Sequence, residues 1–352
     1  MWILALVGCD ADSTAEVEAE APESKLFLSP STLTFGTESA SDVLTIRSIG
    51  ELPVGLESVW IEGSAAFSLT DPGAGTLEPG SEVDVVVTFA ATGVEESASV
   101  IVASNAEYAP HSMTLRGGIV GPVAVCDVSP GTIAPLEVAI WQASASYDPE
   151  GRSLVSYEWT LVERPNGSHA RLSSDTDVRF QPDLAGTYVA ELVVMNDAGV
   201  RSEPCSATLE VAPTDQLWIE MFWSQSGDDM DLHLVAPEGE LVTNGDCYYG
   251  TCTYGRLDWG VRGDDTDDPV MDLVDIPGTG PEAITLPVPG AGEFIVYVHD
   301  YPGSVYIGRN DVTLNVYVHG VLAWTETRDL DEEDLYEPFV AITFPEGVVA
   351  GL

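Results

Sequence analysis

Polar and apolar residues alternate along most of this chain, and this period of two constrains its fold more than any other feature of the sequence. In the segment VDVVVTF, residues 83–89, every second side chain is apolar, and Asp84 and Thr88 stand between them. The same period recurs in VTLNVYVH, residues 312–319. Alternation of this kind puts the apolar residues on one face of a β-strand. With 33 Gly and 23 Pro residues to form turns, we expect an all-β chain without long helices.

The length of the chain, 352 residues, exceeds that of a usual single domain. Gly121 and Pro122 interrupt the strand pattern, and Pro213 interrupts it again. We therefore predict three tandem β-sandwich domains, over residues 26–118, 121–213 and 214–352.

The N-terminal segment MWILALVGC, residues 1–9, is an apolar run that ends in the letters LVGC. It resembles the signal and lipobox of bacterial lipoproteins, which implies that Cys9 becomes the lipid-modified first residue of the mature protein. Acyl chains on Cys9 then anchor the protein to a membrane without a spanning helix. The alternatives are an ordinary secretory signal and a chance apolar start. Residues 10–25 are polar and acidic, and we expect them to form a disordered tether.

The charge and the cysteine content limit which partners the protein can bind and which compartment it can occupy. The chain carries 58 acidic and 12 basic residues, a formal net charge of −46. Such a surface repels nucleic acid and favours a soluble monomer. The cysteines indicate an oxidising compartment. Cys247 and Cys252 lie in one short segment, and Cys126 and Cys205 flank one predicted domain, so we expect these two disulfides among the three pairings that four cysteines allow.

The first predicted domain, residues 26–118, contains a series of strand motifs, among them LSPSTLTFG, LEPGSEVDVVVTFAA and ASVIVASNAEYAPHSMTLRGG. In order and spacing they resemble the ASPM, SPD-2 and Hydin type of Ig-like domain common in bacterial surface proteins. The resemblance implies a sandwich of about seven strands, and it brings no catalytic residues.

The second predicted domain, residues 121–213, contains SYDPEGRSLVSYEWTLVERPNGS and FQPDLAGTYVAELVVMNDAGVRSEPCSATLEV. These motifs resemble a PKD domain, another Ig-like sandwich, and imply a spacer or adhesive role. We expect Trp159 and Tyr188 in its core. Some PKD domains bind calcium through turn carboxylates, which here are Asp148, Glu150 and Asp197. Turn formation beside Pro and Gly explains these residues without a metal.

The third predicted domain, residues 214–352, contains WSQSGDDMDLHLVAPEG, DDPVMDLVDIPGTGPEAITL and GEFIVYVHDY. These segments resemble a bacterial extracytoplasmic family of the YfaP type, which implies a location and a fold but no established activity. We expect a jelly-roll-like sandwich. Its strongest strand candidates are Leu217–Trp223, Met230–Val235, Glu293–Asp300, Val312–His319 and Phe339–Phe344.

Carboxylates form the first candidate site of this domain. Asp229 and Asp231 alternate on one strand face, and an acid-rich segment follows them. The oxygen ligands that calcium requires are then predicted to be Asp229, Asp231, Asp268, Asp272, Asp275 and Glu282. The alternative is a solvated acidic loop without a metal.

His233, His299 and His319 raise the question of zinc, because each lies on a predicted strand of the same domain. Their spacing matches no known zinc pattern, so we expect structural imidazoles, with zinc as the alternative. The sequence also contains no nucleophile elbow of the G-x-S-x-G kind.

Together these features predict a non-enzymatic lipoprotein of the bacterial cell envelope, lipid-anchored and extracytoplasmic. It would present its sandwich modules for binding an unknown protein or envelope partner, with calcium as a stabilising cofactor. The first alternative is a carbohydrate-binding surface protein, since Trp and Tyr residues including Trp259 and Tyr301 gather in the last domain. A metal-assisted hydrolase in the last domain ranks third.

Overall fold

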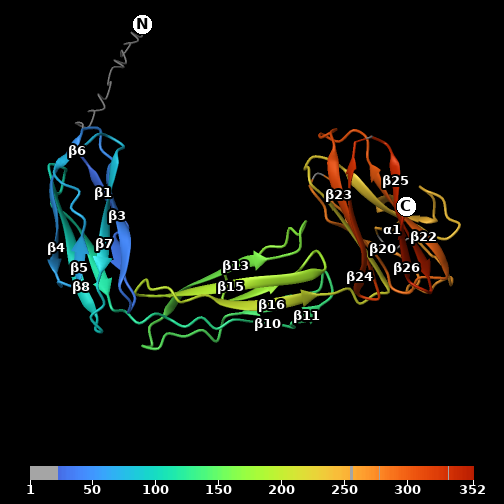
Figure 1. Cartoon of the computed structure of the whole chain (residues 1–352), viewed down its shortest axis with the longest axis horizontal. Helices are drawn as coiled ribbons and strands as arrows, with labels where there is room; N and C mark the ends of the chain where they lie inside the picture. The colour runs from blue at the N-terminus through green and yellow to red at the C-terminus, as the bar shows by residue number, and fades with distance from the viewer. Residues whose placement is uncertain (1–22, 254–256, 277, 332) are drawn as a thin grey trace, which may run out of the picture. The chain divides into compact units, whose positions relative to one another are not determined.

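The computed structural model of this chain describes residues 23–253, 257–276, 278–331 and 333–352. The fold is all-β, as predicted: strands form three tandem β-sandwiches, and one four-residue helix, Tyr249–Cys252 (α1), is present in the described ranges (Figure 1). Cys9 and residues 10–22 lie outside the described residues, so the predictions for the anchor and most of the tether remain predictions. In the described ranges, no helix combines the length and the apolar character that a membrane span requires.

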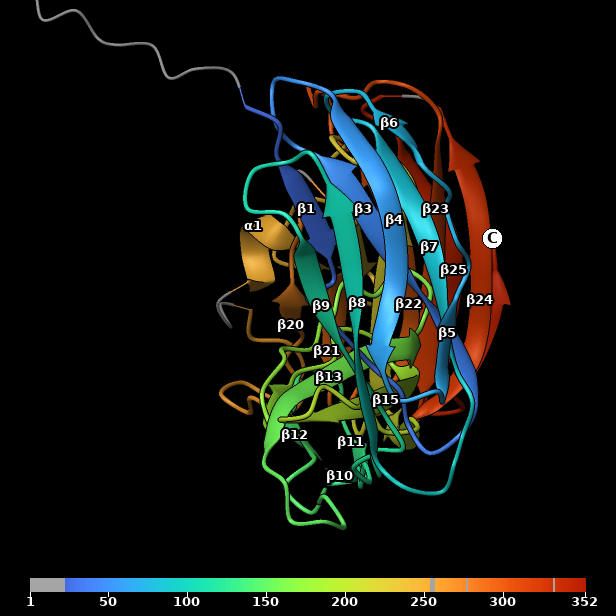
Figure 2. The same ribbon diagram turned by 90° about the vertical axis from the view of Figure 1, so that its left-hand side faces the viewer.

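The first sandwich consists of a four-stranded sheet, β1-β3-β7-β5, and a five-stranded sheet, β2-β9-β8-β4-β6, in which β4, β8 and β9 lie side by side (Figure 2). Val85, Val87 and Phe89 are buried between the sheets while Asp84 is exposed, as the alternation predicts. The strands are β1 (Leu26–Ser29), β2 (Thr32–Thr34), β3 (Ala40–Ser48), β4 (Val54–Gly63), β5 (Phe67–Leu69), β6 (Gly75–Leu77), β7 (Glu82–Phe89), β8 (Glu96–Ser104) and β9 (His111–Gly117).

The middle sandwich pairs a three-stranded sheet, β10-β12-β14, with a four-stranded sheet, β11-β16-β15-β13. Trp159 and Tyr188 are both in its core, as expected. They are linked by a chain of ring contacts that runs through Trp141 and Phe180. The strands are β10 (Asp127–Ser129), β11 (Thr132–Ile133), β12 (Ala139–Gln142), β13 (Leu154–Glu163), β14 (Asp177–Phe180), β15 (Gly186–Asn196) and β16 (Cys205–Val211).

The last sandwich consists of two five-stranded antiparallel sheets, β20-β21-β17-β23-β24 and β19-β18-β22-β25-β26. All five strands expected from the sequence are present at similar bounds. The strands are β17 (Leu217–Trp223), β18 (Met230–Val235), β19 (Asp246–Cys247), β20 (Val270–Leu273), β21 (Glu282–Leu286), β22 (Gly292–Asp300), β23 (Asn310–Val318), β24 (Val321–Leu330), β25 (Tyr336–Phe344) and β26 (Val348–Gly351).

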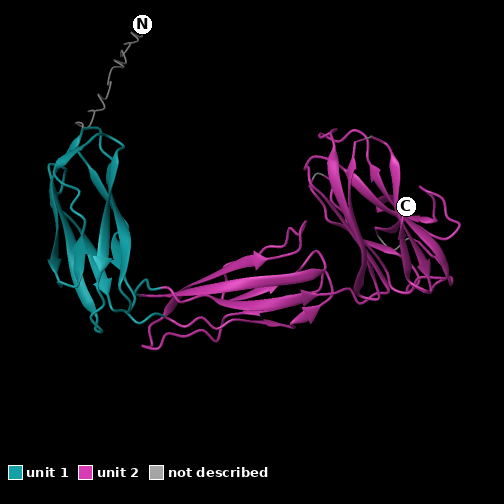
Figure 3. Ribbon diagram, in the orientation of Figure 1, with its two compact units in different colours: residues 1–121, 198–200 teal, residues 122–197, 201–352 magenta. Residues whose placement is uncertain are grey.

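By compactness the chain divides into two units rather than three (Figure 3). One unit is Met1–Gly121 with Ala198–Val200, and the other is Pro122–Asp197 with Arg201–Leu352. The middle and last sandwiches therefore share a unit, although each has its own hydrophobic core. The three domain boundaries read from the sequence stay a prediction.

Strand β17 is buried on both faces, and this explains why the second unit holds together. Its carboxylate Glu220 is 1% exposed. Glu220 accepts hydrogen bonds from Trp218 Nε1 and the Ala185 backbone N–H, both at 3.0 Å, and from Asn315 Nδ2 at 3.0 Å and the Tyr317 hydroxyl at 3.2 Å. Burial raises the pKa of Glu220, and these four donors oppose that rise. Ala185 belongs to the middle sandwich, so one buried carboxylate hydrogen-bonds residues of both sandwiches.

Candidate functional site

Strands β18 and β22 bring together aspartate and histidine side chains on the polar face of their sheet. Asp231 and His233 are two residues apart on β18, so they share a face while Leu232 between them enters the core. On β22, His299 pairs directly with Asp231 in the antiparallel register. One ligand atom from each of these three residues lies within 4.8 Å of the others, and all three residues are buried.

His233 is held by a carboxylate from the neighbouring strand β19. Its Nδ1 lies 2.7 Å from Asp246 Oδ2, and Asp246 also accepts a hydrogen bond of 2.8 Å from the Val242 backbone N–H. The other ring nitrogen of His233, Nε2, is buried and has no hydrogen-bond partner. Asp246 therefore orients the imidazole and leaves Nε2 free.

His299 lies between two carboxylates. Its Nδ1 is 3.5 Å from Asp231 Oδ2, and its Nε2 is 3.3 Å from Asp334 Oδ1. Burial acts to lower the pKa of His299, but hydrogen bonds to Asp231 and Asp334 outweigh it and raise the pKa above its usual value. The polar face thus contains negative charge that favours a cation between its two imidazoles.

Tyrosine rings enclose this group. Tyr336 stacks on His299 at 3.9 Å and 1°, and Tyr248 stacks on His233 at 4.8 Å and 13°. Tyr249 and Tyr301 complete a closed circuit of ring contacts. The circuit joins six aromatic side chains, the four tyrosines and the two histidines. Burial first, and then nearby carboxylates that include Asp231, raise the pKa values of Tyr248, Tyr249 and Tyr336. Asp231 therefore lies close to three of the four tyrosines.

The predicted calcium ligands divide into separate groups. Asp229 is half-buried beside Asp231, and burial together with the charges of Asp231, Asp228 and Asp275 raises the pKa of Asp229 to about 6. Glu282 is fully buried and accepts a hydrogen bond of 2.8 Å from the Leu232 backbone N–H. Burial, and after it the charges of Asp231 and Asp229, raise the pKa of Glu282. Asp229, Asp231, Asp275 and Glu282 are thus electrostatic neighbours.

The structure places the two remaining predicted ligands elsewhere. Asp268 accepts a hydrogen bond from the Trp259 backbone N–H, and its charged neighbours are Asp258, Asp267 and Asp265. Asp272 is exposed on β20. Asp231 does not contribute to the electrostatics of either carboxylate, whereas it does to those of Asp229 and Glu282.

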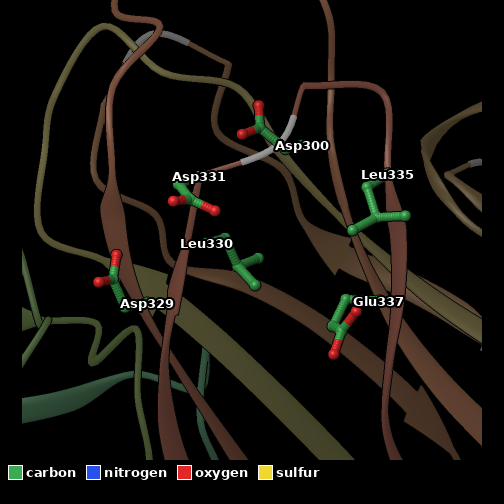
Figure 4. A pocket seen from close by; sticks show the side chains of 6 residues that line it. All are labelled: Asp300, Asp329, Leu330, Asp331, Leu335 and Glu337. Carbon is green, nitrogen blue, oxygen red and sulfur yellow. The ribbon is translucent and has the colours of Figure 1, made fainter.

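An acidic cavity of about 190 Å³ lies near the end of β22 (Figure 4). It is lined by Asp300, Asp329, Leu330, Asp331, Leu335 and Glu337. Arg309 lies 3.1 Å from Asp329 and 3.2 Å from Asp331, and Arg328 lies 3.6 Å from Glu337. Two guanidinium groups therefore face three of the four carboxylates that line the cavity.

A second cavity, of about 330 Å³, is lined by Trp259 and Phe294 together with polar groups that include Asn244, Glu238 and Asp267. The ring centroids of Trp259 and Phe294 are 6.2 Å apart. Trp218, another tryptophan of the last sandwich, is buried. Of the two, Trp259 alone lines an accessible hollow.

The cysteines pair as expected, Cys126 with Cys205 and Cys247 with Cys252. The second disulfide closes the segment of α1 directly beside Tyr248, which is the residue that stacks on His233. It therefore constrains one wall of the histidine cluster.

Sequence reasoning separated the carboxylates from the histidines, whereas the fold combines them. Asp246 and Asp334 were not foreseen, because neither lies near a histidine in the sequence. The Asp231-x-His233 spacing was the available signal, since both residues must share a strand face. His319, the third histidine considered, is exposed at a turn with a φ of 52° and stands apart from the cluster.

Comparison with known proteins gives structural similarity but no family. No protein-family model matches the chain, and no curated protein matches it either. The fibronectin(III)-like modules of Clostridium thermocellum CbhA are 10% identical and cover 53% of this chain and 94% of theirs, with a TM-score of 0.31. The ASH / PapD-like domain 7 of human CEP192 is 20% identical, and the match covers 32% of this chain and 99% of that domain, with a TM-score of 0.23. The I67-I69 fragment of titin is 13% identical, and the match covers 81% of this chain and 96% of that fragment, with a TM-score of 0.22. Similarities at this level carry no argument about function.

Proposed function

We propose that this chain is an extracytoplasmic binding protein of the bacterial cell envelope, anchored by a lipid on Cys9. In this proposal the first sandwich is a spacer of the ASPM, SPD-2 and Hydin type and the middle sandwich a PKD-like spacer. The last sandwich, of the YfaP type, supplies the binding surface. The disulfides support an oxidising compartment.

The observation that carries the proposal is the closed circuit of four tyrosines and two histidines beside Asp231. It lies on the polar face of its sheet, opposite the hydrophobic core, so packing of that core does not require it. Tyr249 and Tyr301 remain 43% and 41% exposed at its rim. Rings that are fixed in place and partly exposed provide contact area at low entropic cost.

The test immobilises the chain and exposes it to peptidoglycan sacculi, membrane vesicles and a glycan array. We expect one preparation to be retained, and Tyr249→Ala with Tyr301→Ala to lower retention roughly tenfold or more, about 1.4 kcal/mol. Tyr108→Ala with Tyr147→Ala is the matched control, because these tyrosines are exposed in the first and middle sandwiches. No retention of any preparation, or an equal loss in the control, contradicts the proposal. Palmitate labelling that persists in Cys9→Ser contradicts the anchor.

Carbohydrate recognition is the second candidate, and the cavity that Trp259 and Phe294 line favours it. One aromatic face beside amide and carboxylate groups is suited to a sugar ring. Retention on the glycan array that is lost in Trp259→Ala and kept in the double Tyr variant would establish it. Calcium stabilisation through the six predicted carboxylates stays a further prediction, and of these Asp229, Asp231, Asp275 and Glu282 are electrostatic neighbours. The metal experiments below distinguish calcium binding from binding of a transition metal.

A further inference from the structure

The polar face of the last sandwich brings together three buried side chains, each of which can offer one ligand atom to a metal ion. Asp231, His233 and His299 are 4%, 1% and 3% exposed, and one ligand atom from each lies within 4.8 Å of the others. Ligand atoms around a tetrahedral ion lie about 3–3.5 Å apart, given metal–ligand distances near 2.1 Å. Small side-chain rotations would therefore bring the three groups to bonding distance.

The free nitrogen of His233 points to a ligand independently of this clustering. Asp246 can only accept at His233 Nδ1, so in the neutral ring Nδ1 carries the proton and Nε2 keeps its lone pair. That lone pair is buried and has no partner. A buried acceptor left unpaired costs about 1–3 kcal/mol, and a bound cation removes the cost. Carboxylates that orient metal-binding histidines in this way are a usual feature of metal sites.

His299 shows a similar arrangement with its nitrogens reversed. Asp334 lies 3.3 Å from Nε2, which leaves Nδ1 facing Asp231 Oδ2 at 3.5 Å. Each imidazole therefore has an orienting carboxylate, Asp246 or Asp334, at one ring nitrogen and its other nitrogen left for a ligand. Two carboxylates orient the two rings, and a third, Asp231, is two residues from His233 on β18 and pairs with His299 across the strands.

Aromatic stacking fixes the planes of both rings. Tyr336 and Tyr248 lie nearly parallel to His299 and His233, at 1° and 13°. The Cys247–Cys252 disulfide closes the segment that carries Tyr248. A metal that binds here meets imidazoles already restrained in orientation, which lowers the entropic cost of binding.

We propose that Asp231, His233 and His299 bind one divalent transition-metal ion of the class that zinc represents. Two imidazoles and one carboxylate suit zinc and its first-row neighbours, whereas calcium requires six to eight oxygen ligands. Three protein ligands leave a coordination position for water or another ligand. The metal site does not depend on the proposed envelope-binding role, and either can fail while the other holds.

The test begins with the full-length chain freed of metal by a chelator. Samples are dialysed against Zn²⁺, Co²⁺ or Ca²⁺ and analysed by mass spectrometry for metal content. We expect retention of one zinc or one cobalt ion per chain, a visible cobalt absorption band, and no retained calcium. Retention of neither zinc nor cobalt overturns the proposal. So does retention of calcium alone, which would favour the oxygen ligands instead.

Variants locate the site. His233→Ala and His299→Ala should weaken zinc affinity roughly 100-fold or more, because changes in outer-shell partners alone cost about 10–100-fold. Asp246 is a positioning residue, so Asp246→Asn should still bind one metal ion per chain. It should shift the cobalt absorption band and weaken zinc affinity by about 10–100-fold. His319→Ala is the matched control and should bind as the wild type does. Circular dichroism of the metal-free variants verifies folding, and His233→Gln replaces His233→Ala if that variant does not fold. Wild-type affinity in folded His233 and His299 variants contradicts the assignment.

Discussion

Asp148 shows how a single buried carboxylate can hold a turn without a metal. It is 8% exposed; Oδ1 accepts from the Glu150 and Arg152 backbone N–H groups at 2.9 and 3.3 Å, and Oδ2 accepts from Asn196 Nδ2 at 2.9 Å. Burial acts to raise the pKa of Asp148, but the hydrogen bonds outweigh it and lower the pKa below its usual value. Turn formation, one of two interpretations open from the sequence, therefore satisfies both carboxylate oxygens.

We predict that Asp148→Asn lowers the free energy of unfolding at pH 7 by about 1–3 kcal/mol. The new amide has only one acceptor oxygen, so its NH₂ group would face either Asn196 Nδ2 or the backbone N–H groups, donor against donor. The pKa of Asp148 is lower in the folded chain than in the unfolded chain. The stabilisation by its carboxylate is therefore fully present at pH values above the unfolded-state pKa, and it is lost as the pH falls through the folded-state pKa. Urea unfolding at pH 7 and at pH 3 should therefore show the variant and wild type converging in acid. The exposed neighbour Asp197→Asn is the control, and a constant difference at both pH values would contradict this account.

The candidate site was only partly predictable at the residue scale. A period of two places Asp231 and His233 on one face, just as it places Asp229 and Asp231. The sequence does not state that β22 pairs with β18 in the register that sets His299 against Asp231. That register depends on packing of the whole sandwich. The separate oxygen and histidine hypotheses could merge only once the pairing was known.

At the scale of elements, β17 departs from simple alternation. Its sequence LWIEMFW is apolar on both faces except at Glu220, and every residue of the strand is buried. Leu217, Ile219 and Met221 enter the core of the last sandwich. Phe222, on the other face, lies against Gly167 of the middle sandwich. A continuous apolar run predicts burial on both faces, but it does not reveal what covers the second face.

The substitution Gly167→Ala tests whether the middle sandwich covers the second face of β17. The backbone at Gly167 has a φ of +81°, and a Cβ there would overlap the ring of Phe222. Gly151, with a φ of +76° and no atom within 4 Å of such a Cβ, is the matched control. The positive φ should cost either alanine variant about 1–2 kcal/mol. Overlap with Phe222 should cost Gly167→Ala a further ~1–3 kcal/mol. If chemical denaturation shows equal losses of unfolding free energy in the two variants, the Phe222 ring moves aside without cost and this account is wrong.

At the scale of the whole molecule, the fold class followed from local pattern, whereas the grouping of sandwiches did not. Strand alternation and turn residues specify sheets wherever they occur, so the three sandwiches were predictable. The two compact units depend on contacts between segments far apart in the sequence, such as the Ala185 N–H donated to Glu220. No periodicity encodes such a contact.

The distribution of cysteines makes the two units respond differently to reduction. Residues 23–121 contain no cysteine, whereas both disulfides lie in the second unit. Opening the Cys126–Cys205 bridge, with a sequence separation of 79, should remove about 4 kcal/mol of stabilisation. For a unit of this size that corresponds to a fall in Tm of roughly 8–16 °C. Differential scanning calorimetry with and without reductant should therefore show one transition falling and one unchanged. Cys126→Ser with Cys205→Ser should reproduce most of the fall without reductant. A shift of both transitions, or of neither, would show that these disulfides do not stabilise the second unit selectively.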